Sequence, residues 1–87
     1  MKAVELKQGR KLAVKLVSTL KDHMERAGLS KREQEIAHLI YEGLKDREIA
    51  DKLYISRYTV ENHMRSIYAK FGVNNRTRLV RKLIAFG

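Results

Sequence analysis

The sequence predicts an all-α fold, and three observations lead to this prediction. Proline is absent from the 87 residues, so no position forbids a helix on that account. Apolar residues make up 44% of the chain and recur at helical spacing, and no stretch alternates apolar and polar residues long enough for a convincing strand. Gly28, Gly43 and Gly72 each follow an apolar-periodic segment, where a left-handed residue is expected to end a helix.

Composition bounds the classes of function. The chain has 19 Lys and Arg residues against 10 Asp and Glu, so its net charge is +9 and the expected partner is a polyanion, above all nucleic acid. The chain is short for an enzyme. It also shows no nucleophile with an oriented base, no paired carboxylates in an apolar setting and no glycine-rich phosphate loop. We therefore expect no enzyme activity and no cofactor.

Cysteine and long apolar runs are both absent from the sequence. Without cysteine there is no disulfide framework and no Cys-ligated zinc, and the three histidines lack ligand spacing, so no metal site is expected. No run of about 18 apolar residues and no signal-peptide core is present. We therefore expect no membrane span and a cytoplasmic protein in a reducing compartment.

Charge is distributed unevenly along the chain. Residues 1–30 carry seven basic and three acidic side chains, residues 31–51 four basic and six acidic, and residues 52–87 eight basic and one acidic. A nucleic-acid face is therefore expected mainly in residues 52–87, where Glu61 is the sole acid. The alternative is that these basic side chains only solvate the helices.

An amphipathic leading helix is predicted from about Ala3 to Arg26. Its apolar stripe repeats every seven residues and consists of Leu6, Ala13, Leu20 and Ala27, widened by Leu16, Val17 and Met24. Two roles remain open for this stripe: it packs on the rest of the domain, or it forms a coiled-coil-like dimer seam. A membrane-surface helix is disfavoured because the stripe lacks bulky aromatic residues.

Four shorter helices are predicted after the leading helix. Ser30 and Glu33 form a capping box that begins the first of them, and Gly43 ends it. The other three are expected at Asp46–Leu53, Arg57–Phe71 and about Arg76–Ala85.

The two short helices, the tight turn Tyr54-Ile55-Ser56 and the longer basic helix after it form a helix-turn-helix pattern. Ser56 is a good N-cap for that longer helix, and Asn74 or Asn75 can cap the last one.

The helix Arg57–Phe71 has two distinct faces on a helical wheel. The face expected to be buried consists of Val60, Met64, Ile67 and Phe71. The opposite face consists of Tyr58, Glu61, Asn62, Arg65 and Ala69. Arg pairs with guanine, Asn with adenine, and Glu accepts from cytosine, so this face suits the major groove of DNA. The alternative is an ordinary solvated face. His63 lies at the edge of the buried face, where packing or a structural hydrogen bond is expected.

These motifs resemble the LuxR/GerE-type helix-turn-helix domain over about residues 29–84. The resemblance rests on Leu29-Ser30-Lys31-Arg32-Glu33-Gln34-Glu35-Ile36, Glu42-Gly43-Leu44, Glu48-Ile49-Ala50, Leu53, Ile55-Ser56, Thr59-Val60, Asn62-His63, Ile67-Tyr68, Lys70-Phe71-Gly72-Val73, Asn75-Arg76-Thr77 and Val80. Taken together, these motifs are highly specific.

The resemblance implies a four-helix bacterial module that binds double-stranded DNA, regulates transcription and forms a homodimer. Its base contacts map onto Glu61, Asn62 and Arg65, the face that the helical wheel also selects. The full set that we expect to contact DNA is Lys52, Ser56, Arg57, Tyr58, Thr59, Glu61, Asn62, Arg65, Lys70 and Arg76. The family's dimer contact maps onto the last helix, on Leu79, Val80, Leu83 and Ile84, of which one pair is expected to face the core.

Three positions depart from the family pattern. Lys45 replaces a Ser-type cap, so the helix start is expected to depend on Asp46. Glu61 stands where a basic residue is common, which indicates weaker generic affinity and an altered base preference. Phe71 replaces a more usual Leu, a tolerable change in the core.

Two segments are expected: residues 1–28 form a leading helix or linker, and residues 29–87 form the DNA-binding domain. The first 28 residues are too few for a receiver or ligand-sensing domain, so the chain is either a stand-alone regulator or the C-terminal part of a larger one. A different class of function is a protein-interaction module that uses the leading and last helices. A non-specific or RNA-binding protein is disfavoured by Glu61 and by the scarcity of aromatics for stacking. RNA polymerase is left open as a further partner.

Overall fold

The computed structural model describes residues 20–86, and every regular element in this range is helical. Residues 20–26 form the end of the predicted leading helix, and the residues of its stripe before Leu20 lie outside the described range. The elements that follow are α2 (Lys31–Tyr41), α3 (Asp46–Leu53), α4 (Arg57–Phe71) and α5 (Arg76–Phe86). The predicted all-α fold is therefore confirmed, and the boundaries predicted for α3, α4 and α5 lie within one residue of the observed ones.

Local capping residues begin α2 and α5 as the sequence predicts. The Glu33 N–H donates to Ser30 Oγ at 3.1 Å, and the Ser30 N–H donates to Glu33 Oε1 at 2.8 Å, which completes the capping box. At α5 the Arg78 N–H donates to Asn75 Oδ1 at 2.9 Å, so Asn75 rather than Asn74 is the cap. These bonds satisfy backbone donors that have no partner inside their helices.

The start of α3 differs from the expectation. The N-cap Lys45 has no acceptor atom in its side chain, and its own N–H donates to Glu48 Oε1 at 2.9 Å. Asp46 takes no part in this cap, because its carboxylate binds Arg76 of α5. The expectation that Asp46 supports this helix start is therefore corrected: Glu48 does so.

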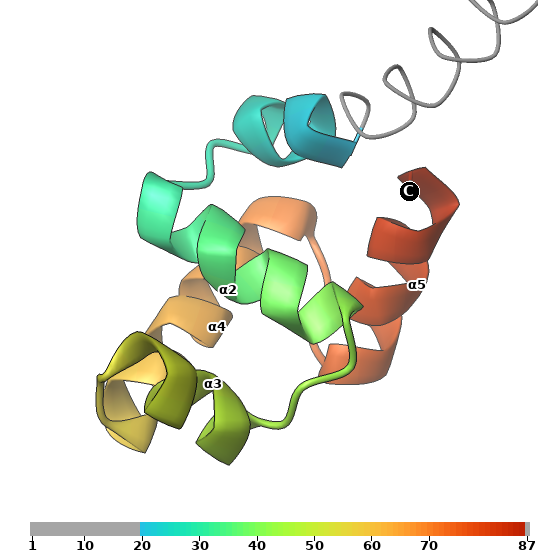
Figure 1. Cartoon of the computed structure of the whole chain (residues 1–87). Helices are drawn as coiled ribbons and strands as arrows, with labels where there is room; N and C mark the ends of the chain where they lie inside the picture. Colours follow the sequence, from blue (N-terminus) through green and yellow to red (C-terminus); the bar gives the residue numbers. More distant parts are fainter. Residues whose placement is uncertain (1–19, 87) are drawn as a thin grey trace, which may run out of the picture.

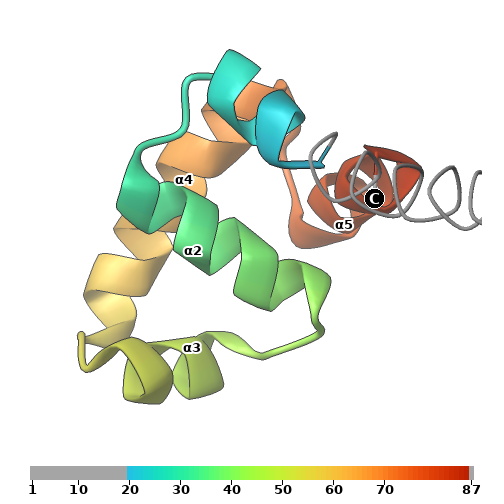
Figure 2. The same ribbon diagram turned by 45° about the horizontal axis from the view of Figure 1, so that its top comes forward.

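A single core joins the helices, and α2 lies at its centre. This helix contacts α3, α4 and α5, and it crosses α4 in both ribbon views (Figures 1 and 2). Leu20 and Met24 of the leading helix are also buried in this core, at 7% and 6% exposed. Residues 20–26 thus pack on the domain, as one of the two roles for the apolar stripe requires.

Gly72 shows why glycine ends α4. Its φ of 69° is in the left-handed region, and a Cβ placed there would meet no atom within 4 Å, so the requirement is conformational rather than steric. This turn directs the chain from α4 into α5, whose Leu79 and Leu83 then reach the core at 0% and 1% exposed.

Candidate nucleic-acid interface

The polar face of α4 is fully presented to solvent. Val60, Met64, Ile67 and Phe71 are all buried, which confirms the predicted inner face. The residues opposite them are exposed, and they are Tyr58, Glu61, Asn62, Arg65 and Ala69. Burial of one face in the core therefore holds the other face outward.

Glu61 and Arg65 lie one turn apart on this face but form no ion pair, since no salt bridge joins them among residues 20–86. Both border a shallow hollow of about 190 Å³ on the flank of α4, together with Tyr68 and Asp46. The acid and the base are therefore each available to a ligand. An i, i+4 pair that only stabilises the helix would have occupied both.

The N-terminus of α4 carries two hydroxyl groups side by side. The Thr59 N–H donates to Ser56 Oγ at 3.0 Å, and Ser56 Oγ lies 2.9 Å from Thr59 Oγ1. One hydroxyl hydrogen is used between the two oxygens, so one remains free to donate outward. Arg57 and Tyr58 follow directly and are exposed, so donors gather where the helix begins.

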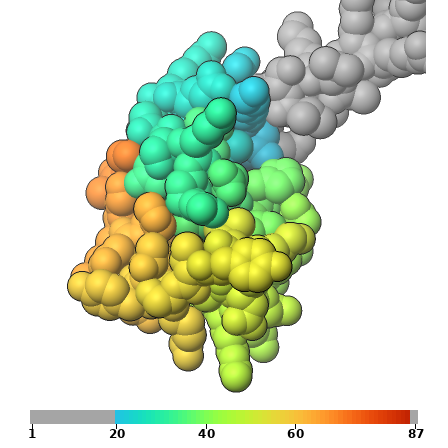
Figure 3. Space-filling model, turned by 60° about the vertical axis from the view of Figure 1, so that its left-hand side comes forward, coloured from blue at the N-terminus to red at the C-terminus, as the bar shows by residue number. Residues whose placement is uncertain are grey.

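The turn before α4 exposes Tyr54, a residue that is missing from the predicted DNA-contacting set. Tyr54 ends α3 in the left-handed region at φ 56°, and its side chain is 94% exposed. The Ile55 N–H donates to the Ala50 carbonyl at 3.0 Å and closes the turn. Figure 3 shows the end of α3 and the start of α4 together at one end of the molecule, far from the blue residues of the leading helix. The sequence signal that could have indicated an exposed Tyr54 is the presence of an aromatic residue in a tight turn.

Lys70 lies away from this face. Its Nζ is 2.6 Å from Glu33 Oε1 of α2, and the Glu33 side chain is only 6% exposed. Burial alone would raise the pKa of Glu33, but hydrogen bonds from Lys70, Ser66 and the Ser30 backbone outweigh it and lower that pKa from 4.5 to about 2. Lys70 therefore neutralises a buried acid inside the domain.

Arg76 is likewise engaged inside the domain. Its guanidinium donates to Asp46 Oδ1 at 2.8 Å and to the Leu44 carbonyl, so it fastens the start of α5 to the start of α3. Lys52, the third outlying residue of the predicted DNA-contacting set, borders a groove on α2 instead of the outer face of α4. The structure thus groups Ser56 to Arg65 and leaves Lys52, Lys70 and Arg76 outside that group.

The predicted dimer surface on α5 is corrected in part, because two of its four residues lie in the core. Leu79 and Leu83 are 0% and 1% exposed within this chain's own core, so neither reaches a second subunit. The sequence expects one of the two pairs to face the core without saying which, and the structure shows that it is this pair. Ile84 is 60% exposed and Val80 is half-buried, so these two remain on the outer side of α5.

Metal-binding and membrane-spanning features are not found in the part of the chain that the structure describes. Within residues 20–86 no cluster of three or more His, Asp or Glu side chains is placed to hold a metal ion. No helix in that range is both long enough and apolar enough to cross a membrane.

Comparison with known proteins identifies this architecture. The family described as "Bacterial regulatory proteins, luxR family" matches residues 27–83. The chain belongs to the LuxR family. This is a family of DNA-binding, helix-turn-helix transcription regulators and not an enzyme family.

Named relatives share this region. The spore germination protein GerE of Bacillus subtilis is 39% identical over 59 residues, which cover 68% of this chain and 80% of GerE. The transcriptional regulatory protein DegU of Brevibacillus brevis is 42% identical over 59 residues, covering 68% of this chain and 25% of DegU.

The oxygen regulatory protein NreC of Staphylococcus aureus is 44% identical over 63 residues, covering 67% of this chain and 29% of NreC. Against a regulator from Mycobacterium tuberculosis the match spans only 6% of the relative's length. No solved structure matches the chain.

Proposed function

We propose that this LuxR-family chain is a sequence-specific double-stranded DNA-binding transcription regulator that inserts α4 into the major groove. The observation that carries the proposal is the outward face of α4, where Glu61, Asn62 and Arg65 are exposed and unpaired. A net charge of +9 supplies the general attraction to a polyanion.

The dimensions of this face suit base readout. From Tyr58 to Arg65 the helix advances about 10 Å, the length of about three base pairs, and the major groove is wide enough for one helix. We assign Arg65 to guanine and Asn62 to adenine, because their donors and acceptors fit those base edges. We assign Glu61 to a cytosine amino group, or to the orientation of Arg65.

Phosphate contacts are proposed at the start of α4. The free hydroxyl hydrogen of the Ser56–Thr59 pair and the side chains of Arg57 and Tyr58 are donors, and backbone N–H groups at a helix N-terminus favour anions. These contacts set the position of the helix, whereas the bases give specificity.

A homodimer through the outer side of α5 completes the proposal. Val80 and Ile84 form the apolar patch that a second copy would cover. Residues 29–87 form the DNA-binding domain of each copy, and residues 20–26 pack on it. Action in the cytoplasm and contact with RNA polymerase follow from the proposed role.

The test compares Arg65→Ala with Arg78→Ala, an equal loss of charge at an exposed residue of α5. Binding is titrated on a duplex selected from a random pool and on its scrambled version. Arg65→Ala is expected to cost about 1–3 kcal/mol on the selected duplex and little on the scrambled one. Equal losses on both duplexes, or equal losses for the two variants, would refute base readout by Arg65.

A further inference from the structure

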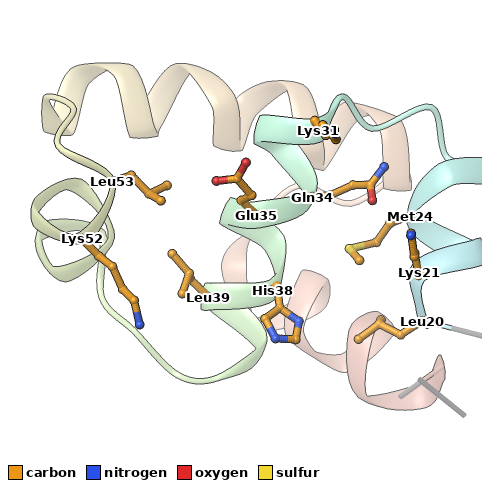
Figure 4. Close-up of a pocket in the computed structure, with 10 residues that line it drawn as sticks. All are labelled: Leu20, Lys21, Met24, Lys31, Gln34, Glu35, His38, Leu39, Lys52 and Leu53. Carbon is orange, nitrogen blue, oxygen red and sulfur yellow. The ribbon is translucent and has the colours of Figure 1, made fainter. Parts of the chain in front are cut away.

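A second surface lies over the outer side of α2. A groove of about 660 Å³ is bordered by three elements: residues 20–24 of the leading helix, α2, and the end of α3. Figure 4 shows α2 in the middle, with Leu20 and Met24 on one side and Leu53 on the other. Leu39 of α2 completes the apolar lining. No residue of α4 borders this groove, although Lys52 and Leu53 lie at the end of α3, close to the start of α4.

The rim of the groove is basic. Lys21, Lys31 and Lys52 border it, one from each of the three elements. None of these lysines has an ion-pair partner among the described residues. The groove therefore combines an apolar floor with three available positive charges.

Two other titratable groups face the groove, and both are already engaged. Glu35 Oε2 is 3.4 Å from Arg32 Nη1, and His38 Nε2 is 3.0 Å from Glu42 Oε1. Glu35 is thus the sole acid on the rim, and Arg32 offsets its charge. The electrostatic character of the rim is set by the lysines.

Charge decides which occupant suits this groove. Residues 1–19 of this chain carry five basic side chains and one acidic side chain, so the rim repels them. A second copy of the chain is assigned to α5 in the proposed homodimer, and α5, with four basic and no acidic side chains, does not complement a basic rim. An apolar floor also suits DNA poorly, because phosphates and sugars offer no apolar stripe.

We propose that the groove binds an acidic amphipathic helix of another protein. Such a helix places apolar side chains at i, i+3 or i+4, and i+7 on the floor of the groove, and its Asp or Glu side chains reach the rim lysines. The groove does not include the α4 residues that are proposed to read bases, so a partner bound there leaves those residues uncovered. The proposal is independent of which bases α4 reads.

The test uses designed peptides as probes. The first peptide is a helix of about 16 residues with leucines on one face and glutamates on the others, the second has lysines in place of the glutamates, and the third is a scramble of the first. Fluorescence anisotropy measures binding to the full chain, and amide chemical shifts locate it. We expect saturable binding of the first peptide alone, with changes in amide chemical shift around Leu39 and Leu53.

Matched charge reversals separate the groove from general attraction. The variant Lys21→Glu/Lys31→Glu changes two rim residues, and the control Arg26→Glu/Arg81→Glu makes the same change in net charge at exposed residues that do not border the groove. The rim variant is expected to weaken binding of the acidic peptide at least about tenfold, and the control far less.

Four results would overturn the proposal. The first is equal binding of the acidic and basic peptides, and the second is an equal loss of peptide affinity for the two double variants. The third is a set of chemical-shift changes confined to α4 and α5. The fourth is a rim variant that loses DNA affinity or changes oligomeric state while its peptide binding is unaltered. The last would make the groove a DNA or self-association surface.

Discussion

The buried Glu33 should make part of this domain's stability depend on pH. Its folded-state pKa is about 2 against 4.5 for the ordinary group, so the carboxylate stabilises the fold above about pH 4.5 and loses that contribution as the pH falls toward 2. A shift of this size corresponds to about 3 kcal/mol in the free energy of unfolding. The contribution comes from Lys70, Ser66 and the Ser30 backbone, which favour the charged form against the cost of burial.

Glu33→Gln keeps the shape and removes the charge. We expect it to lower the free energy of unfolding by about 2–3 kcal/mol near neutral pH, measured by denaturant titration. The difference from the parent protein should shrink by more than half between about pH 6 and pH 3. In this range the Glu33 carboxyl of the unfolded parent, with its ordinary pKa of 4.5, takes up a proton while the folded protein keeps it charged, so the charge stabilises the fold less.

Glu35→Gln is the matched control. It lies on the same helix, but its side chain is 52% exposed and pairs only with Arg32 at 3.4 Å, so its effect should stay within about 0.5 kcal/mol. A difference between Glu33→Gln and the parent that is constant from pH 6 to pH 3 would refute the assigned role of the Glu33–Lys70 pair.

Four further substitutions test the packing, each by denaturant unfolding. Arg76→Ala should lower stability by about 1–2 kcal/mol because it frees Asp46 from its partner, while the salt dependence of DNA binding stays unchanged; a reduced salt dependence with normal stability would make Arg76 a phosphate contact. Leu79→Ala should lower the free energy of unfolding by about 2–5 kcal/mol, and Ile84→Ala by less than about 0.5 kcal/mol. Similar losses for the two variants would contradict the observed burial. Asn75→Ala should cost about 1 kcal/mol through the lost cap of α5, and no loss would show that the cap is dispensable.

Local features of the fold can be predicted because their causes lie close together in sequence. The inner face of α4 follows from spacing at three and four residues, so the burial of Val60 and Met64 can be predicted from the sequence alone. The capping box of α2 likewise spans only the residues from Ser30 to Glu33.

Other features depend on how the helices pack. Lys70 reaches a residue 37 positions away and Arg76 one 30 positions away, and no local pattern predicts either pair. The sequence predicts Lys70 and Arg76 as members of the DNA-contacting set. A basic residue in or near a recognition helix can contact phosphate or can pair with an acidic residue of another helix, and the sequence does not distinguish these two roles. On α5, Leu79 with Leu83 and Val80 with Ile84 have the same spacing, so only the position of the core decides which pair is inside.

Selection from a random pool of duplexes tests the central claim most directly. The full chain is mixed with the pool, bound duplexes are recovered and amplified over several rounds, and the enriched sequences are compared. Base readout by α4 predicts one recurring motif, present twice in opposite orientation if α5 joins two copies, whose preference at one position is lost when Arg65→Ala is used. The contrary result is a folded protein whose affinity for the pool depends only on the salt concentration, with no motif enriched in any round. This result would contradict the claim that α4 reads sequence.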